Sequence, residues 1–245
     1  MAASIKASFT ASGDWIARLH WRIFPPRCLV CAGEGTGRRD LCSACALELP
    51  RLGSCCQCCA EPLSRAGLCG RCLRVPPLFD QVSAPFLYAP PLDRLIKAFK
   101  FDGQLEAGRL LADLMADFLT DVLDGQERPQ ALLPVPLHPN RWRERGYNQA
   151  LELARPIAQR LGIPLLPNAL QRLRDTPQQA QLALPQRQRN IRAAFAVPQA
   201  LALQHIAIID DVMTTGSTAN EIARVLRAAG VKRVQVWVCA RVVLS

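Results

Sequence analysis

The sequence lacks several features that would identify common classes of protein. No apolar run approaches the roughly 20 residues of a membrane-spanning helix, so we expect no membrane span. The absence of a G-x-x-x-x-G-K-[ST] motif, and of G-x-G-x-x-G behind any strand candidate, excludes Walker-type and Rossmann-type nucleotide binding. Residues 1–27 do not follow the order of a secretory signal. We therefore expect a cytoplasmic protein with a loosely ordered leader.

Acidic residues are outnumbered, with 20 Asp and Glu against 30 Lys and Arg and a formal net charge of +10. Nearly all of the basic residues are arginines, and they are frequent between Arg141 and Arg192. Arginine suits bidentate contacts with phosphate groups. Such a field fits a small diphosphate substrate or a nucleic-acid backbone, and charge alone does not separate these two partners.

Cysteine is abundant, and all but one of the 11 cysteines lie in two similar blocks between Cys28 and Cys72. Each block carries two C-x-x-C pairs, and two such pairs can complete a tetrahedron around zinc. In a compartment that keeps thiols reduced, disulfides are the weaker interpretation. The predicted ligands are Cys28, Cys31, Cys42 and Cys45 in the first block and Cys56, Cys59, Cys69 and Cys72 in the second.

The second block is ambiguous because Cys55 and Cys58 form a competing pair; we favour Cys56 and Cys59, which repeat the geometry of the first block. No histidine lies inside the module, so an open catalytic zinc position is not expected. One or two zinc ions should be structural and should supply the folding energy of this small segment. Cys239 lies in a strand pattern and is expected to be a buried apolar thiol.

The order of the predicted elements indicates an α/β domain behind the cysteine-rich module. Proline residues near position 76 mark the boundary, which gives a leader at 1–27, a double zinc ribbon at 28–75 and an α/β domain at 76–245. Apolar spacing predicts strands alternating with helices, which favours a parallel sheet with flanking helices. The strands are expected at 131–135, 169–173, 193–197, 206–209 and 234–239, and the helices at 92–100, 105–123, 149–161 and 218–229.

The most informative segment joins the apolar run 206–209 to two acids and then to a turn rich in hydroxyl groups and glycine. Asp210 and Asp211 follow the strand at the sheet edge where ligands of open α/β sheets bind, and their carboxylates can accept hydrogen bonds from ribose hydroxyls. The next residues lie where a helix begins, so their backbone N–H groups and hydroxyls should bind a phosphate. These residues are Thr214, Thr215, Gly216, Ser217 and Thr218.

Two further segments complete the predicted site. The basic loop between the strand at 131–135 and the helix at 149–161 places Arg145 and Gly146 at the same sheet edge, where they could bind a diphosphate; the same arginines beside Trp142 could instead bind nucleic acid. The long polar segment 172–190 is expected to be a lid that brings Arg187 and Arg189 over the diphosphate, with a disordered linker as the alternative.

The segment 206–218 resembles the phosphoribosyl diphosphate (PRPP) signature of type I phosphoribosyltransferases. With the two cysteine blocks, the Phe99–Gly103 patch, the Val135–Gln149 loop and the Thr176–Asn190 segment, the chain resembles the ComF family of competence-associated proteins from about Cys28 onward. The resemblance implies a type I phosphoribosyltransferase-like fold and a cytoplasmic protein linked to the uptake or handling of single-stranded DNA. It leaves the reaction open.

Two hypotheses follow. The first is a PRPP-binding phosphoribosyltransferase or a protein like one, associated with DNA uptake or nucleotide metabolism, which binds PRPP or another ribose phosphate together with Mg²⁺. In that reaction the anomeric carbon becomes cation-like, so Asp210, Asp211, Arg187 and Arg189 are the candidate catalytic residues. The second is a non-catalytic adaptor that binds single-stranded DNA and contacts competence-machinery proteins.

Overall fold

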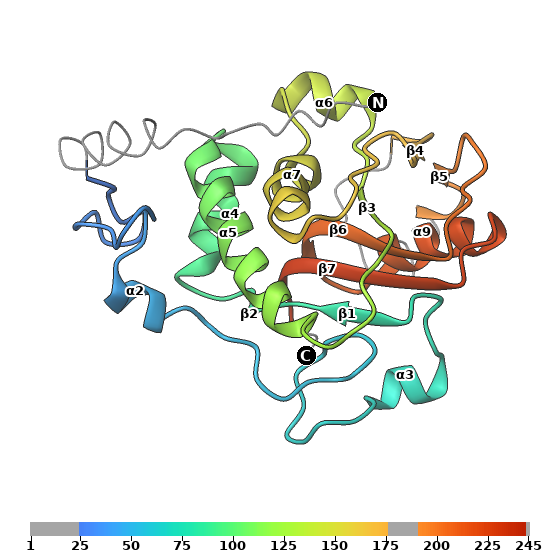
Figure 1. Cartoon of the computed structure of the whole chain (residues 1–245), viewed down its shortest axis with the longest axis horizontal. Helices are drawn as coiled ribbons and strands as arrows, with labels where there is room; N and C mark the ends of the chain where they lie inside the picture. The colour runs from blue at the N-terminus through green and yellow to red at the C-terminus, as the bar shows by residue number, and fades with distance from the viewer. Residues whose placement is uncertain (1–24, 176–190, 244–245) are drawn as a thin grey trace, which may run out of the picture. The chain divides into compact units, whose positions relative to one another are not determined.

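The structure is a computed structural model, and it describes residues 25–175 and 191–243 (Figure 1). The chain divides into two compact units, residues 1–48 and 49–245. The first unit contains the first cysteine block and the short helix α2 (Ser43–Leu47). The second contains the second cysteine block with α3 (Gly70–Arg74) and the α/β domain. The domain boundary near residue 76 stays a prediction.

A parallel sheet forms the centre of the second unit, in the order β1-β7-β6-β3. It comprises β1 (Gln81–Ser83), β3 (Ala131–Pro134), β6 (His205–Met213) and β7 (Arg233–Arg241), and the short β2 (Phe86–Leu87) also pairs with β7. The central strands are buried on both faces, which explains their nearly continuous apolar runs. The predicted α/β class with a parallel sheet is confirmed.

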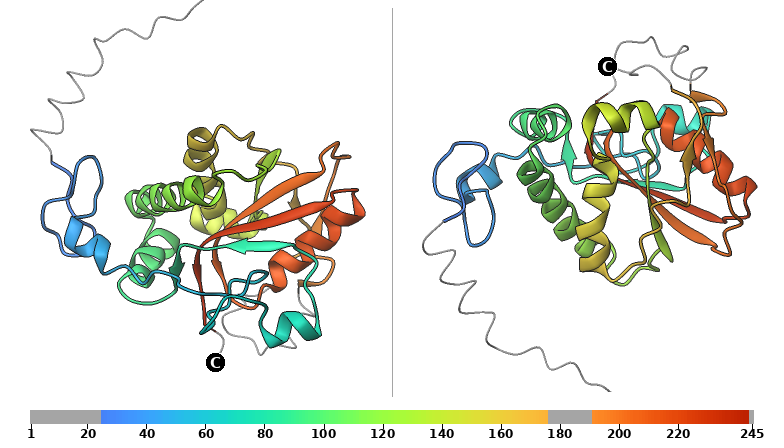
Figure 2. Two further views of the ribbon diagram at one scale, coloured as in Figure 1. Left: turned by 60° about the horizontal axis from the view of Figure 1, so that its bottom comes forward. Right: turned by 90° about the horizontal axis from the view of Figure 1, so that it is seen from above.

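Helices cover both faces of the sheet (Figure 2). One face carries α4 (Leu92–Phe101), α5 (Leu105–Val122) and α7 (Gln149–Leu161), and α9 (Ser217–Ala228) lies on the other. Alternation along the strands divides the core: Ile208 and Val236 pack in one cluster with Leu226 of α9. Trp237 and the fully buried Cys239 have the opposite parity and face the other way. Burial raises the pKa of the Cys239 thiol, as expected for an apolar core cysteine.

The structure corrects three details of the predicted elements. The strand candidates near 171 and 195 become β4 (Gln171–Arg172) and β5 (Phe195–Ala196), which form a separate antiparallel pair outside the main sheet. The predicted basic loop contains a helix, α6 (Pro139–Arg145). No residue of α6 is buried, so it has no apolar stripe by which a pattern could predict it. β1 and β2 were not predicted, because strands this short carry too little periodicity.

Candidate functional site

The segment 210–218 connects the end of β6 to the start of α9. Gly216 is the N-cap of α9 and has a left-handed backbone, φ 79°, which favours glycine. The Thr215 and Ser217 hydroxyls lie 2.8 Å apart, and the Ser217 amide donates to Thr215 Oγ1 at 3.3 Å. The first amides of a helix have no partner within the helix and carry the positive end of its dipole. This turn, residues 214–218, is called the phosphate loop below because its chemistry suits an anion.

The two acids lie within β6, near its carboxyl end, and not after the strand. Asp211 is buried, and its Oδ2 lies 2.8 Å from Lys100 Nζ at the end of α4. Burial, with a contribution from Asp211, raises the pKa of Asp210 to about 7. Burial alone would lower the pKa of Lys100, but the attraction of Asp211 raises it above its ordinary value. Lys100 therefore balances the charge of only one of two carboxylates that would otherwise repel each other.

A cavity of about 540 Å³ opens over these acids and the phosphate loop. Three arginines line it: Arg141, Arg145 and Arg172. Arg145 lies over the ring of Phe101 at 5.4 Å from the ring centroid, and burial lowers its pKa. Arginines opposite an anion-binding turn make a pocket that suits a ligand with two separate phosphate groups.

Hydrogen bonds tie the segment 145–149 to the end of α4. Gly146 ends α6 in a left-handed conformation with φ 77°. The Tyr147 hydroxyl donates to the Phe99 carbonyl, and the two rings lie 5.6 Å apart. Asn148 then caps α7 by accepting from the amides of Ala150 and Leu151. The patch 99–103 and the segment 145–149 are thus fixed to each other beside the acids.

Most predicted residues of this site meet, and some interactions were not predicted. The structure brings together Asp210, Asp211, the phosphate loop and Arg145, whereas Arg187 and Arg189 lie outside the described residues. The ion pair between Lys100 and Asp211 was not predicted. Arg241 was also not predicted; its one signal in the sequence is a charge directly after the apolar run 236–240.

The cysteines gather into two clusters. The structure brings together the eight residues that the spacing predicts, with all ligand atoms of a cluster within 4.8 Å of one another: Cys28, Cys31, Cys42 and Cys45, and separately Cys56, Cys59, Cys69 and Cys72. Within the clusters, Sγ of Cys31 lies 3.8 Å from that of Cys42, and Sγ of Cys59 lies 3.6 Å from that of Cys69. Zn–S bonds of about 2.3 Å in a tetrahedron separate sulfurs by about 3.8 Å, so both clusters fit structural zinc.

Backbone donors favour thiolates in both clusters. Cys45 N donates to Cys42 Sγ at 3.4 Å, and Cys69 N donates to Cys56 Sγ at 3.3 Å. Burial would raise the pKa of Cys56, but hydrogen bonds from the backbone of Cys59, Cys69 and Cys58 lower it to about 6. Cys55 and Cys58 are not among the four residues whose ligand atoms lie within 4.8 Å of one another, and the Cys58 thiol donates to the Phe79 carbonyl at 3.9 Å. The competing pair is therefore outside the second cluster.

Comparison with known proteins agrees with both parts of this description. Residues 19–73 match the family model of the double zinc ribbon domain. The chain is 37% identical to competence protein F of Haemophilus influenzae over 88% of this chain and 96% of the relative. It is 34% identical to the DNA utilization protein YhgH of Escherichia coli K12 over 93% and 96% of the two chains. Competence protein ComFC of Streptococcus pneumoniae is more distant, at 28% over 64% and 66%.

The chain is thus a member of the ComF family. Its two four-cysteine clusters and its double zinc ribbon support structural zinc. Among the residues that the structure describes, no helix is long and apolar enough to span a bilayer.

Proposed function

We propose that this chain is a PRPP-binding, phosphoribosyltransferase-like protein that acts in DNA uptake or DNA utilization. The DNA-related role is supported by the names of its relatives, competence protein F and DNA utilization protein YhgH. The observation that carries the PRPP proposal is the cavity that joins two acids, an anion-binding turn at a helix start and three arginines.

In this proposal each side of the cavity recognises one part of the ligand. The phosphate loop binds the 5'-phosphate with its amides and hydroxyls. Asp210 and Asp211 accept hydrogen bonds from the ribose hydroxyls, and Lys100 orients the Asp211 carboxylate. Arg145 and Arg172 lie on the cavity wall, where they would contact the diphosphate. The sequence adds Arg187 and Arg189 as predicted diphosphate ligands.

These contacts suit a transfer reaction at the anomeric carbon. As the bond to diphosphate breaks, negative charge grows on the leaving group, and arginines placed there stabilise it. Mg²⁺ bound with the diphosphate would supply further neutralisation of that charge. The acids would orient the ribose so that the acceptor approaches the opposite face.

Calorimetric titration with PRPP and Mg²⁺ tests this function. Wild-type protein should bind, and Asp211→Asn should lose most of the affinity because an amide is a weaker acceptor and Lys100 loses its partner. Asp124→Asn removes the same charge from an exposed position and should bind like wild type. Failure of wild-type protein to bind PRPP, or equal binding by all three proteins, would refute the proposed site.

A second candidate function is direct binding of single-stranded DNA by α6. Trp142 on this helix is 55% exposed, and arginines flank it on both sides. Exposed aromatic side chains among arginines suit stacking with bases and contacts to phosphates. The double variant Trp142→Ala, Arg143→Ala should weaken DNA binding over a salt series and leave PRPP binding unchanged. DNA affinity equal to that of wild type would remove α6 as the binding surface.

A further inference from the structure

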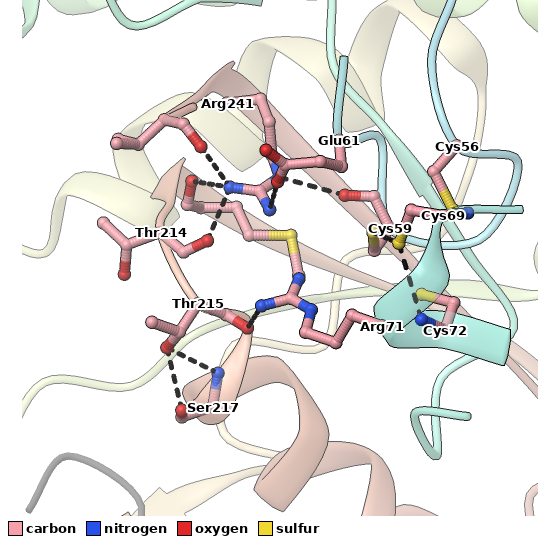
Figure 3. Close-up of polar contacts among 12 residues, drawn as sticks. Cys56, Cys59, Glu61, Cys69, Arg71, Cys72, Thr214, Thr215, Ser217 and Arg241 are labelled. Atoms are coloured by element: carbon pink, nitrogen blue, oxygen red, sulfur yellow. Dashed lines mark hydrogen bonds and ion pairs between the residues drawn. The ribbon is translucent and has the colours of Figure 1, made fainter. Parts of the chain in front are cut away.

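Arg241, the last residue of β7, is fully buried and connects the second zinc ribbon to the candidate site (Figure 3). Its guanidinium donates to the Cys59 carbonyl at 3.0 Å and pairs with Glu61, both in the ribbon. The same group donates to the carbonyls of Met213 at 3.2 Å and Thr214 at 2.5 Å. The buried Arg241 guanidinium therefore connects the backbone of the predicted zinc ligand Cys59 to the first residue of the phosphate loop, Thr214.

A second arginine makes the same connection from the ribbon side. Arg71 lies on α3, whose N-cap is the cysteine ligand Cys69. Its Nη1 donates to the Thr215 carbonyl at 3.4 Å, and Figure 3 shows its side chain extending from the cysteine cluster to the loop. Thr215 in turn bonds the Ser217 hydroxyl at the start of α9. A shift of α3 would thus be transmitted to the groups expected to bind phosphate.

The ribbon also shares a hydrophobic core with the helix that follows the loop. All four cysteines of the second cluster pack in the same group of buried side chains as Phe79, Ile222 and Leu226. The first cluster belongs to the other compact unit, residues 1–48. The two zinc sites therefore differ in kind: the second is built into the α/β domain.

We infer that zinc at the second cluster sets the conformation of the phosphate loop, with Arg241 and Arg71 as positioning residues. The identity of the ligand rests on the proposed function; the coupling itself does not. Four-cysteine ribbons fold as they bind metal, so loss of zinc would release the Cys59 carbonyl and Glu61 from Arg241. The buried guanidinium of Arg241 would then lack two of its acceptors. It would shift relative to the Met213 and Thr214 carbonyls, to which it still donates, and so change the conformation of the loop. By reciprocity, an anion bound in the loop should tighten zinc at this site.

Loop conformation can be measured without any ligand, by amide hydrogen exchange of peptides covering residues 212–218. Arg71→Ala should exchange faster there, whereas Arg74→Ala removes a charge from the same helix and should exchange like wild type. Cys72→Ser should lose one zinc and exchange faster, whereas Cys42→Ser should lose one zinc from the other unit and leave the loop unchanged. If Cys72→Ser does not fold, the comparison of Arg71→Ala with Arg74→Ala decides whether the ribbon is coupled to the loop.

Binding gives the second readout. Because one hydrogen bond contributes about 0.5 to 1.5 kcal/mol, Arg71→Ala should weaken PRPP binding by about 2- to 10-fold, with Arg74→Ala unchanged. PRPP should also slow the rate at which a chelator removes one of the two zinc ions, the one at the second cluster. Absence of PRPP binding by wild type would refute the proposed function but not the coupling. Unchanged exchange in Arg71→Ala, or in a folded Cys72→Ser that has lost its zinc, would overturn the coupling.

Discussion

Asp210→Asn should stabilise the ligand-free protein much more at pH 8 than at pH 5. In the wild type, burial and the neighbouring Asp211 raise the pKa of Asp210 to about 7. The folded protein therefore keeps a proton that the unfolded chain releases between about pH 4 and pH 7. The free energy of unfolding must then fall as the pH rises through this range. An amide cannot ionise, and its oxygen can still accept the Asp211 amide, as Asp210 Oδ1 does at 2.9 Å.

The size of the effect has an upper limit. The difference between an ordinary aspartate pKa of about 4 and a pKa of about 7 corresponds to about 4 kcal/mol at neutral or higher pH. In a protein of this size 1 kcal/mol shifts the melting temperature by about 2 to 4 °C. We therefore expect Asp210→Asn to raise the melting temperature at pH 8 by several degrees and by no more than about 15 °C.

Thermal melts of the zinc-loaded wild type, Asp210→Asn and Asp211→Asn at pH 5 and pH 8 test this reasoning. Asp211→Asn should lower the melting temperature at both values, because Lys100 loses the partner that lies 2.8 Å away. Both substitutions should abolish or strongly reduce PRPP binding. The reasoning is refuted if Asp210→Asn gives the same change at both pH values or destabilises the protein at pH 8. That result would mean that Asp210 is already ionised at low pH or that its carboxylate has a structural role.

Two further predictions concern zinc and the segment 176–190. Purified protein should contain two zinc ions per chain by metal analysis, and a count of one ion in the wild type would contradict the two-site structure. Cys42→Ser should lose one of the two ions and become sensitive to protease within residues 28–48. Arg187→Ala combined with Arg189→Ala should weaken PRPP binding without changing the melting temperature, and an unchanged dissociation constant in calorimetry would favour the linker interpretation of this segment.

Elements with a strong period were predicted well. The expected helices at 92–100 and 149–161 correspond to α4 and α7, which bury one face and end at turn residues. Elements without a periodic pattern of apolar residues were not predicted. Helix α6 has no buried residue, and β1 and β2 exist because β7 offers them an edge with which to pair. Local sequence does not contain that information, since the pairing partner lies about 150 residues away in the chain.

The predicted site shows the same division. The segment 210–218 is local: two acids, hydroxyl residues and a glycine occur together, and their chemistry alone identifies them as a candidate site. Lys100 lies more than 100 residues from Asp211 in sequence, and only the fold places its ammonium group against that carboxylate. A basic residue on an amphipathic helix usually faces solvent, so the ion pair could be found only from coordinates. The same holds for Tyr147, which was expected in a basic loop and instead bonds the Phe99 carbonyl.

Arg241 explains why spacing alone was a poor guide to organisation. The two cysteine blocks look equivalent in sequence, with paired C-x-x-C motifs at similar separations. Only the second is tied to β7 and to the phosphate loop by a fully buried guanidinium, and it packs with Leu226 of α9. A buried arginine is costly unless its donors have acceptors, and these acceptors come from both the ribbon and the loop. The second ribbon is therefore part of the structure that shapes the candidate site, whereas the first ribbon lies in a separate compact unit.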